Sequence, residues 1–506
     1  MKLSVITIFF ILFTFPAFAQ ENTPDDSKPE GVRMTPPVST PPALPNAAKP
    51  EVEKKPETPP LKKVETPATP APPAVKKADP PSKPIPSVKS EFVDKKVPFD
   101  DSVKVTPAVK RIPVISRLKF NLSGFIWLDT WYANTEVYHI ESPFFVKTES
   151  RGDALAFSAR YSRLRFTIDG PSLFCGVENR GVFEMDFFGN LPDSSTSPRQ
   201  PQMRMRLAFV ELKFHDLVIH AGNDWMVAAP QFSSNLDPFN LWGQGNIWMR
   251  YPQINVNYKN EFVKNIRLEA AASVGNSLGG DGPKNTTIRN GGIGEFSALP
   301  TIQARAGIGF KLGKSAWSTV GISGSWQMLN LAAAIDASNK NIYSDDEISA
   351  LKASDSDMIT SWFGAADIQL NYTWNRWKFK ITGEYHQGQA MAMYLGGILQ
   401  NYDIERDTDG NIVKAHPIKS IGYFGDFKVE TPCGFSWTIG GGRNAVDEDD
   451  LFTSERKKNT IMYSNITWTR KFLMLGLGVN YLKTEYSFGK GDADAVIVHF
   501  VTAFKF

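Results

Sequence analysis

The sequence predicts an all-β protein: a transmembrane antiparallel β-barrel of about 16 strands, preceded by a disordered Pro-rich segment. Three observations support this fold class. Apolar and polar residues alternate in segments from residue 118 to the end of the chain, and the connections between those segments are long and short in turn. In addition, 22 of the 35 prolines lie between residues 21 and 115. Alternation with a period of two is typical of strands that have one apolar face.

The composition excludes several other classes of protein. The chain has 506 residues, a formal net charge of +3 and, after its first 20 residues, no apolar run of 18. A helical membrane protein needs such runs, and a nucleic-acid-binding protein usually shows a stronger basic excess. The two cysteines, Cys175 and Cys433, are too few for a disulfide framework or a multi-cysteine zinc site.

Residues 1–19 have the organisation of a secretory signal peptide. Lys2 supplies a positive charge, residues 3–15 form an apolar stretch, and residues 17–19 are a small-x-small cleavage site. This pattern predicts that the mature chain is exported across the inner membrane.

Residues 20–115 are predicted to form a disordered periplasmic linker. Proline recurs in runs such as ATPAPPAVKKADPPSKP, and large apolar residues are few. Such a segment cannot build a core, and proline disfavours helix, which leaves polyproline II and coil. Two roles stay open for residues 21–115: a solvated spacer, or a contact with peptidoglycan or another periplasmic partner.

Residues 116–506 are predicted to form the barrel. In the run LKFNLSGFIWLD, Leu118, Phe120 and Leu122 share one parity, and Lys119 and Asn121 share the other. Similar segments are expected to start near residues 118, 154, 174, 202, 216, 245, 263, 299, 317, 358, 376, 418, 433, 458, 472 and 493.

The connections between these segments alternate in length. Long connections are expected near 134–153, 190–201, 229–244, 277–298, 334–357, 392–417, 445–457 and 487–492. Tight turns are expected at 169–172, 215–216, 259–260, 313–314, 375, 431–432 and 470–471. Because every second connection is tight, the short turns collect at one rim and the long loops at the other. This arrangement is typical of outer-membrane barrels with short periplasmic turns and long external loops.

Aromatic residues also favour a membrane barrel. Trp and Tyr side chains near strand ends are typical of the membrane interface. On the apolar parity they include Trp326, Tyr372, Trp374, Trp377, Trp437 and Trp468. The last strand, AVIVHFVTAFKF, ends in Phe506 and has Phe500 and Phe504 on the same parity. This ending resembles the assembly signal of bacterial outer-membrane proteins.

Over roughly residues 118–506 the chain resembles Gram-negative outer-membrane porins. The resemblance rests on the order of strands and loops and on the runs GVFEMDFFG, MRMRLAFVELKF and AGNDW. Within the porins the chain is similar to the DcaP-like trimeric porins, which carry an N-terminal extension and pass small carboxylates. The resemblance implies a homotrimer in the outer membrane of a Gram-negative bacterium, in contact with lipid and lipopolysaccharide. The extension of that family is a coiled coil, whereas the segment here is Pro-rich and has no heptads.

If the apolar parity faces lipid, the other parity faces the pore. The predicted pore-lining residues are Arg163, Arg165, Glu184, Asp186, Arg204, Arg206, Arg267 and Arg305. The same alternation places Met205, Leu207 and Phe209 on the outer face. An arginine-rich wall in a narrow lumen concentrates anions, and guanidinium groups pair well with carboxylates. Two interpretations stay open: a net preference for anions, or ion pairs that only keep the lumen hydrated and the barrel round.

The connection 229–244, with the sequence APQFSSNLDPFNLWGQ, follows the fifth predicted strand. In sixteen-stranded porins the third external loop folds inward and narrows the pore, and this connection has the matching position. The resemblance therefore implies a constriction loop that includes Phe232, Asp237, Phe239 and Trp242. The alternative is an external loop that is buried at a subunit interface.

Together these features predict an outer-membrane porin for passive diffusion of small hydrophilic solutes, with a modest preference for anions such as small carboxylates. The alternative is a structural outer-membrane anchor with a Pro-rich periplasmic tether. No enzymatic activity, catalytic residue, metal ligand, cofactor or nucleic-acid partner is predicted. Residues 275–279 match the G-x-S-x-G pattern, but they open a loop after a β-strand, whereas a catalytic elbow needs a strand-to-helix turn.

Overall fold

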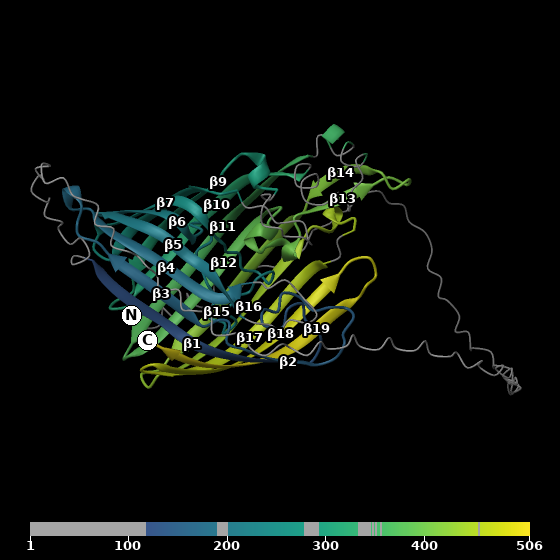
Figure 1. Ribbon diagram of the computed structural model, residues 1–506. Coiled ribbons are helices and arrows are strands. Elements are labelled where there is room, and N and C mark those ends of the chain that lie inside the picture. The colour runs from purple at the N-terminus through teal and green to yellow at the C-terminus, as the bar shows by residue number, and fades with distance from the viewer. Residues whose placement is uncertain are drawn as a thin grey trace, which may run out of the picture. The chain divides into compact units, whose positions relative to one another are not determined.

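The computed structural model describes residues 118–189, 201–277, 293–331, 346, 349, 352–354, 357–453 and 456–506. All of them belong to the second of the chain's two units, Lys104–Phe506. The predicted signal peptide (1–19) and linker (20–115) lie outside the described residues. The described strands form a closed antiparallel barrel (Figure 1), which confirms the predicted fold class.

Seventeen strands make up the wall of the barrel. They are β1 (Lys119–Ala133), β2 (Ala154–Ser158), β3 (Arg163–Asp169), β4 (Glu178–Gly189), β5 (Gln202–Phe214), β6 (Leu217–Trp225), β7 (Arg250–Val263), β8 (Ile266–Gly275), β9 (Thr301–Lys311), β10 (Trp317–Asn330), β11 (Met358–Trp374), β12 (Trp377–Gln389), β15 (Lys419–Glu430), β16 (Phe435–Val446), β17 (Arg456–Arg470), β18 (Leu473–Tyr486) and β19 (Asp492–Lys505). Neighbours in the chain are neighbours in the wall, and β19 pairs with β1 to close it. Because β2 and β3 both pair with β1, they share one position, and the seventeen strands fill sixteen positions.

The second transmembrane strand is interrupted between β2 and β3. Ser162 bends the backbone here: its N–H binds Ala159 O, and its Oγ accepts the Trp127 N–H, each at 3.0 Å. Beside the interruption, the Phe187 N–H of β4 donates to Arg160 O at 3.0 Å. Polar backbone groups inside a membrane need partners within the protein, and these contacts supply them. The single segment expected from residue 154 is therefore two short strands.

The two faces of the wall differ as the alternation predicts. On β19, Ile497 and Val501 are buried inside the barrel, whereas Phe500 and Phe504 are 44% and 48% exposed on its outer face. The outer face also carries five of the expected ring side chains, Trp326, Tyr372, Trp374, Trp377 and Trp437. Among the described residues, no helix is long and apolar enough to span a membrane.

Four connections differ from the sequence prediction. The connection expected at 229–244 spans residues 226–249, so the strand expected from residue 245 begins only at Arg250. Strand β7 continues to Val263, so the turn expected at 259–260 lies at Lys264 and Asn265, where Asn265 has a φ of 67°. The first turn is longer than expected, because a 3-10 turn, η2 (Phe174–Gly176), delays the third strand to Glu178. The connection expected at 392–417 contains a hairpin, β13 (Tyr402–Arg406) and β14 (Ile412–Pro417). The remaining 3-10 turns are η3 (Glu295–Ser297), η4 (Ala392–Tyr394), η5 (Gly397–Leu399) and η6 (Glu448–Asp450).

The hydrogen-bonded circuit of the barrel uses residues 119–505. We therefore predict that a chain lacking residues 21–115 behind its signal peptide still inserts and folds, because every wall strand keeps both neighbours. Electrophoresis with and without heating should show a heat-modifiable band for the truncated chain, as for the full chain. A truncated chain that migrates identically with and without heating would contradict the division at residue 115.

Candidate functional site

The predicted pore-lining carboxylates lie on the inner face of β4. Glu184 is 4% exposed and Asp186 is fully buried, and both face arginines of β5. Arg204 binds Asp186 through two atoms, with Nε–Oδ1 at 3.0 Å and Nη2–Oδ2 at 2.7 Å. Arg206 bridges the two acids, with Nε–Glu184 Oε1 at 2.7 Å and Nη1–Asp186 Oδ2 at 2.8 Å. These charge-assisted bonds fix the guanidinium planes against the wall.

Arg163 and Arg165 reach one of these acids, Glu184, from β3, on the other side of β4. Arg165 Nε lies 3.1 Å from Glu184 Oε2, and Arg163 Nη1 lies 3.6 Å from Glu184 Oε1. The Arg163 guanidinium also stacks over Tyr161 and Phe125, at 4.9 and 5.1 Å from the ring centroids. Its Nε and Nη2 are buried and have no hydrogen-bond partner. Arg163 is thus held largely by aromatic rings.

Arg250 joins this cluster and was not predicted from the sequence. Its guanidinium lies over Trp225 and Trp248, at 4.9 and 5.4 Å from the ring centroids, and it forms no ion pair with a described carboxylate. Arg250 is the first residue of β7, and Tyr251, which follows it in the chain, is buried inside the barrel. Strict alternation would therefore place Arg250 on the outer face, which is why the sequence pattern did not reveal it.

Leu207 and Phe209 were predicted from the alternation to lie on the outer face, and this prediction is wrong. A bulge in β5 leaves Arg206 without a register partner, since Glu184 pairs with Leu207 and Met185 with Met205. Leu207 consequently turns inward and is 1% exposed, and the Phe209 ring stacks on His220 at 4.4 Å. Met205 stays on the outer face as expected, because it precedes the bulge.

Loop 226–249, between β6 and β7, folds into the barrel. Along its first half it binds successive wall strands, and the residues of these contacts are far apart in the chain. The Val227 N–H donates to Gln303 of β9, the Ala229 N–H to Ser323 of β10, the Gln231 amide to Asp367 of β11, and the Ser234 N–H to Asp426 of β15. These contacts place the loop across the interior. An external loop at a subunit interface, the alternative left open by the sequence, does not describe this position.

The expected constriction residues all lie inside the barrel. Phe232 packs on Trp225 and Trp248, with centroids 5.1 and 5.8 Å away. Phe239 contacts Phe188 of β4 at 4.8 Å and Trp242 at 4.7 Å. Asp237 is 4% exposed and accepts the Phe239 N–H at 2.8 Å. The aromatic members therefore anchor the loop, and Asp237 shapes its tip.

A cavity of about 300 Å³ lies between this loop and the arginine wall, and we call it the arginine chamber. It is lined by Trp127, Tyr161, Arg163, Arg206, Trp225, Phe232, Asn235, Leu236, Asp237, Pro238, Asn240 and Trp248. Arg163 and Arg206 bring guanidinium groups to its lining, and Asp237 brings a carboxylate. Arg165, Arg204 and Arg250 belong to the same network of contacts, so five guanidinium groups face three carboxylates, Glu184, Asp186 and Asp237, around the chamber.

Arg267 and Arg305 do not belong to the arginine chamber. They form a second cluster on β8 and β9. There, Arg305 binds Asp367 at 2.8 Å and Glu269 at 3.1 Å, and Arg267 pairs with Glu269. Two arginines facing two carboxylates carry no net charge. Within the described residues, no group of three or more His, Cys, Asp or Glu could hold a metal ion.

No family model and no curated protein matches the chain. The crystal structure of the outer-membrane channel DcaP of Acinetobacter baumannii matches it with a TM-score of 0.54 and 16% identity, over 77% of this chain and 98% of that chain. The barrel has the fold of an outer-membrane porin. This porin-type barrel also matches the anion-selective porin from Comamonas acidovorans, at 12% identity over 77% of this chain and 100% of that chain, with a TM-score of 0.45. OmpF of Salmonella typhi in complex with daunomycin matches at 11% identity over 77% and 99% of the two chains, with a TM-score of 0.46.

Removal of residues 232–242 from the porin-type barrel should raise its single-channel conductance, because this segment fills the interior beside the arginine chamber. Planar-bilayer recording of the purified protein measures the change. A deletion of residues 407–411 from the turn of the β13–β14 hairpin is the matched control and should leave conductance unchanged. If the first deletion yields a heat-modifiable barrel of unaltered conductance, loop 226–249 does not constrict the pore.

Proposed function

We propose that this chain is an outer-membrane porin through which small hydrophilic solutes diffuse passively, with a modest preference for anions such as small carboxylates. The observation that supports this proposal most directly is the excess of five guanidinium groups over three carboxylates, Glu184, Asp186 and Asp237, around the arginine chamber. Arginine stays protonated at any working pH, so the excess is permanent. A fixed positive wall in a narrow lumen raises the local concentration of anions.

Geometry also favours carboxylates over other anions of the same charge. Arg163 and Arg250 have buried guanidinium N–H groups without hydrogen-bond partners, so donors remain for a solute that passes. A guanidinium can bind both oxygens of a carboxylate at once. The preference stays modest because salt screens charge over about 8 Å at physiological ionic strength.

Export and assembly are part of the same proposal. The pattern of residues 1–19 supports secretion, and the apolar outer face with its rings supports insertion into the outer membrane beside lipid and lipopolysaccharide. The resemblance to trimeric porins supports a homotrimer. Residues 20–115 would then lie in the periplasm, as a spacer or as a contact with peptidoglycan.

Charge substitutions in the chamber test the selectivity. Joint replacement of Arg163, Arg165 and Arg250 by Gln should lower the chloride-over-potassium permeability ratio by roughly twofold per charge. This is the Coulomb effect of one charge at about 8 Å in water on the anion and the cation together, after salt screening over that distance. These three are chosen because Arg204 and Arg206 neutralise buried acids, and their loss would leave unpaired charges. Glu184→Gln should shift the ratio in the opposite direction.

The reversal potential in a salt gradient measures both shifts. Arg151→Gln is the matched control, since this arginine lies 87% exposed on an external loop, paired with Glu136. Wild-type protein that prefers potassium would refute the anion preference. A folded barrel with no steady conductance would instead support the structural anchor with a periplasmic tether.

A further inference from the structure

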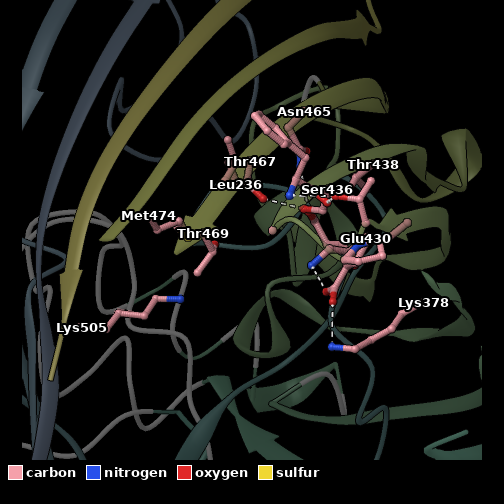
Figure 2. A pocket seen from close by; sticks show the side chains of 16 residues that line it. Leu236, Lys378, Glu430, Ser436, Thr438, Asn465, Thr467, Thr469, Met474 and Lys505 are labelled. Carbon is pink, nitrogen blue, oxygen red and sulfur yellow. Dashed lines mark hydrogen bonds and ion pairs between the residues drawn. The ribbon is translucent and has the colours of Figure 1, made fainter. Parts of the chain in front are cut away.

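A second and larger cavity, of about 530 Å³, lies on the other side of the tip of loop 226–249 (Figure 2). Its walls are β12 and β15–β19, and the tight turn 431–434 places it toward the rim of the short turns. Leu236 lines both this cavity and the arginine chamber, so the loop tip separates the two. Leu236, at the tip of the loop, packs closely against Gly476 of β18. A methyl group added to Gly476 would lie only 3.0 Å from Leu236 Cδ1. We call this second space the hydroxyl cavity.

The inner faces of β16 and β17 give the cavity its chemistry. Ser436 and Thr467 are cross-strand partners, and so are Thr438 and Asn465. The two hydroxyl oxygens of the first pair lie 2.5 Å apart. Further hydroxyl groups come from Ser234, Thr431 and Thr469. Six hydroxyls and one amide thus line one cavity, whereas five aromatic rings and two arginines line the arginine chamber.

Two of these polar groups are buried without a partner. Thr438 is 1% exposed and Asn465 is 3% exposed. Among the described residues, no group forms a hydrogen bond with Thr438 Oγ1 or Asn465 Oδ1. A buried polar atom without a hydrogen bond is unfavourable, so these two atoms favour an occupant that carries donors of its own.

Three lysines and one glutamate supply the charge. Glu430 accepts from Lys378 Nζ at 3.2 Å and from Lys428 Nζ at 2.9 Å. Lys505 lies across the cavity from Lys378 (Figure 2) and forms no ion pair with a described carboxylate. The lining therefore holds an excess of two positive charges beside the hydroxyl face.

We propose that the hydroxyl cavity binds a small polyhydroxylated organic anion. Its hydroxyl groups would pair with the face formed by Ser436, Thr438, Asn465 and Thr467, and its carboxylate or phosphate would lie toward Lys505. Neutral polyols would lack the charged contact, and simple fatty acids would lack the hydroxyl contacts. This inference rests on the proposed porin function, which would bring the solute to the cavity, and it names one class among the anions that pass.

Calorimetric titration of the full chain in detergent tests the site directly. The probes are gluconate, glucose 6-phosphate, sorbitol and hexanoate. Gluconate or glucose 6-phosphate should bind at least tenfold more tightly than sorbitol and hexanoate, and the tighter of the two identifies the anionic group. Equal affinity for gluconate and hexanoate, or no binding of either hydroxylated anion, would overturn the proposal.

Variants separate the two kinds of contact. Joint replacement of Thr438 and Thr467 by Val should weaken gluconate binding about tenfold and leave hexanoate binding unchanged. Lys505→Gln, at the edge of the cavity, should weaken gluconate binding to the level of sorbitol, and it provides a test if the double variant does not fold. The matched control is Thr460→Val on the outer face of β17. An equal loss of affinity in this control would overturn the site.

Conductance recording distinguishes this proposal from the porin function. Steady conductance without gluconate binding overturns the hydroxyl cavity as a binding site and leaves the porin function in place. Gluconate binding that responds to the two sets of variants, in a barrel without conductance, retains the site and overturns the porin function.

Discussion

The pairing of β19 with β1 is the interaction on which the rest of the structure depends. A sheet in hydrocarbon cannot leave an edge of unpaired N–H and C=O groups, so the first and last strands must meet. Once the sheet is closed, each strand has one face toward the membrane and one toward an enclosed space. Ion pairs such as those of β4 and β5 thereby form in the interior, where partial shielding from water strengthens each of them. The two-atom contact between Arg204 and Asp186 is one of these ion pairs.

The interior of the closed barrel is organised by loop 226–249. The loop forms hydrogen bonds with strands from β9 to β17, and Leu236 at its tip lies against β18. It therefore divides the enclosed space into two cavities of different chemistry. Gly245 shows how closely the loop approaches the wall. It has a φ of +117°, and a Cβ there would lie 2.2 Å from Tyr423 O. A larger residue at this point would push the return path of the loop away from β15.

Much of this architecture could be predicted from the sequence, because alternation and connection length are local properties. They gave sixteen wall positions and the inward direction of Arg163, Glu184 and Arg204. The alternation failed where a bulge adds one residue to a strand, because the side chains after the bulge then lie on the opposite face from the one expected. The bulge at Arg206 reverses the parity of Leu207 and Phe209, and no local composition marks it.

Other features depend on contacts between distant parts of the chain, which alternation does not report. Arg250 turns inward at the start of β7 because Trp225 and Trp248 provide a surface for its guanidinium. The path of the loop follows contacts such as Gln231 with Asp367, residues that lie 136 positions apart. From the sequence, the hydroxyl groups of β16 and β17 are only polar side chains on two separate strands. The strand register, which pairs Thr438 with Asn465, is what brings them together in one cavity.

The course of loop 226–249 also has a mechanical consequence. A hollow sixteen-stranded cylinder resists bending along its strands, but its cross-section can flatten into an ellipse when the bilayer presses on it. Here the segment leaves the wall after β6, is fixed to the opposite side by the Ser234 N–H to Asp426 and by Leu236 against β18, and returns to β7. It therefore acts as an internal strut across one diameter of the barrel. Changes in lateral pressure would then alter the width of the two cavities less than in an empty cylinder of the same size.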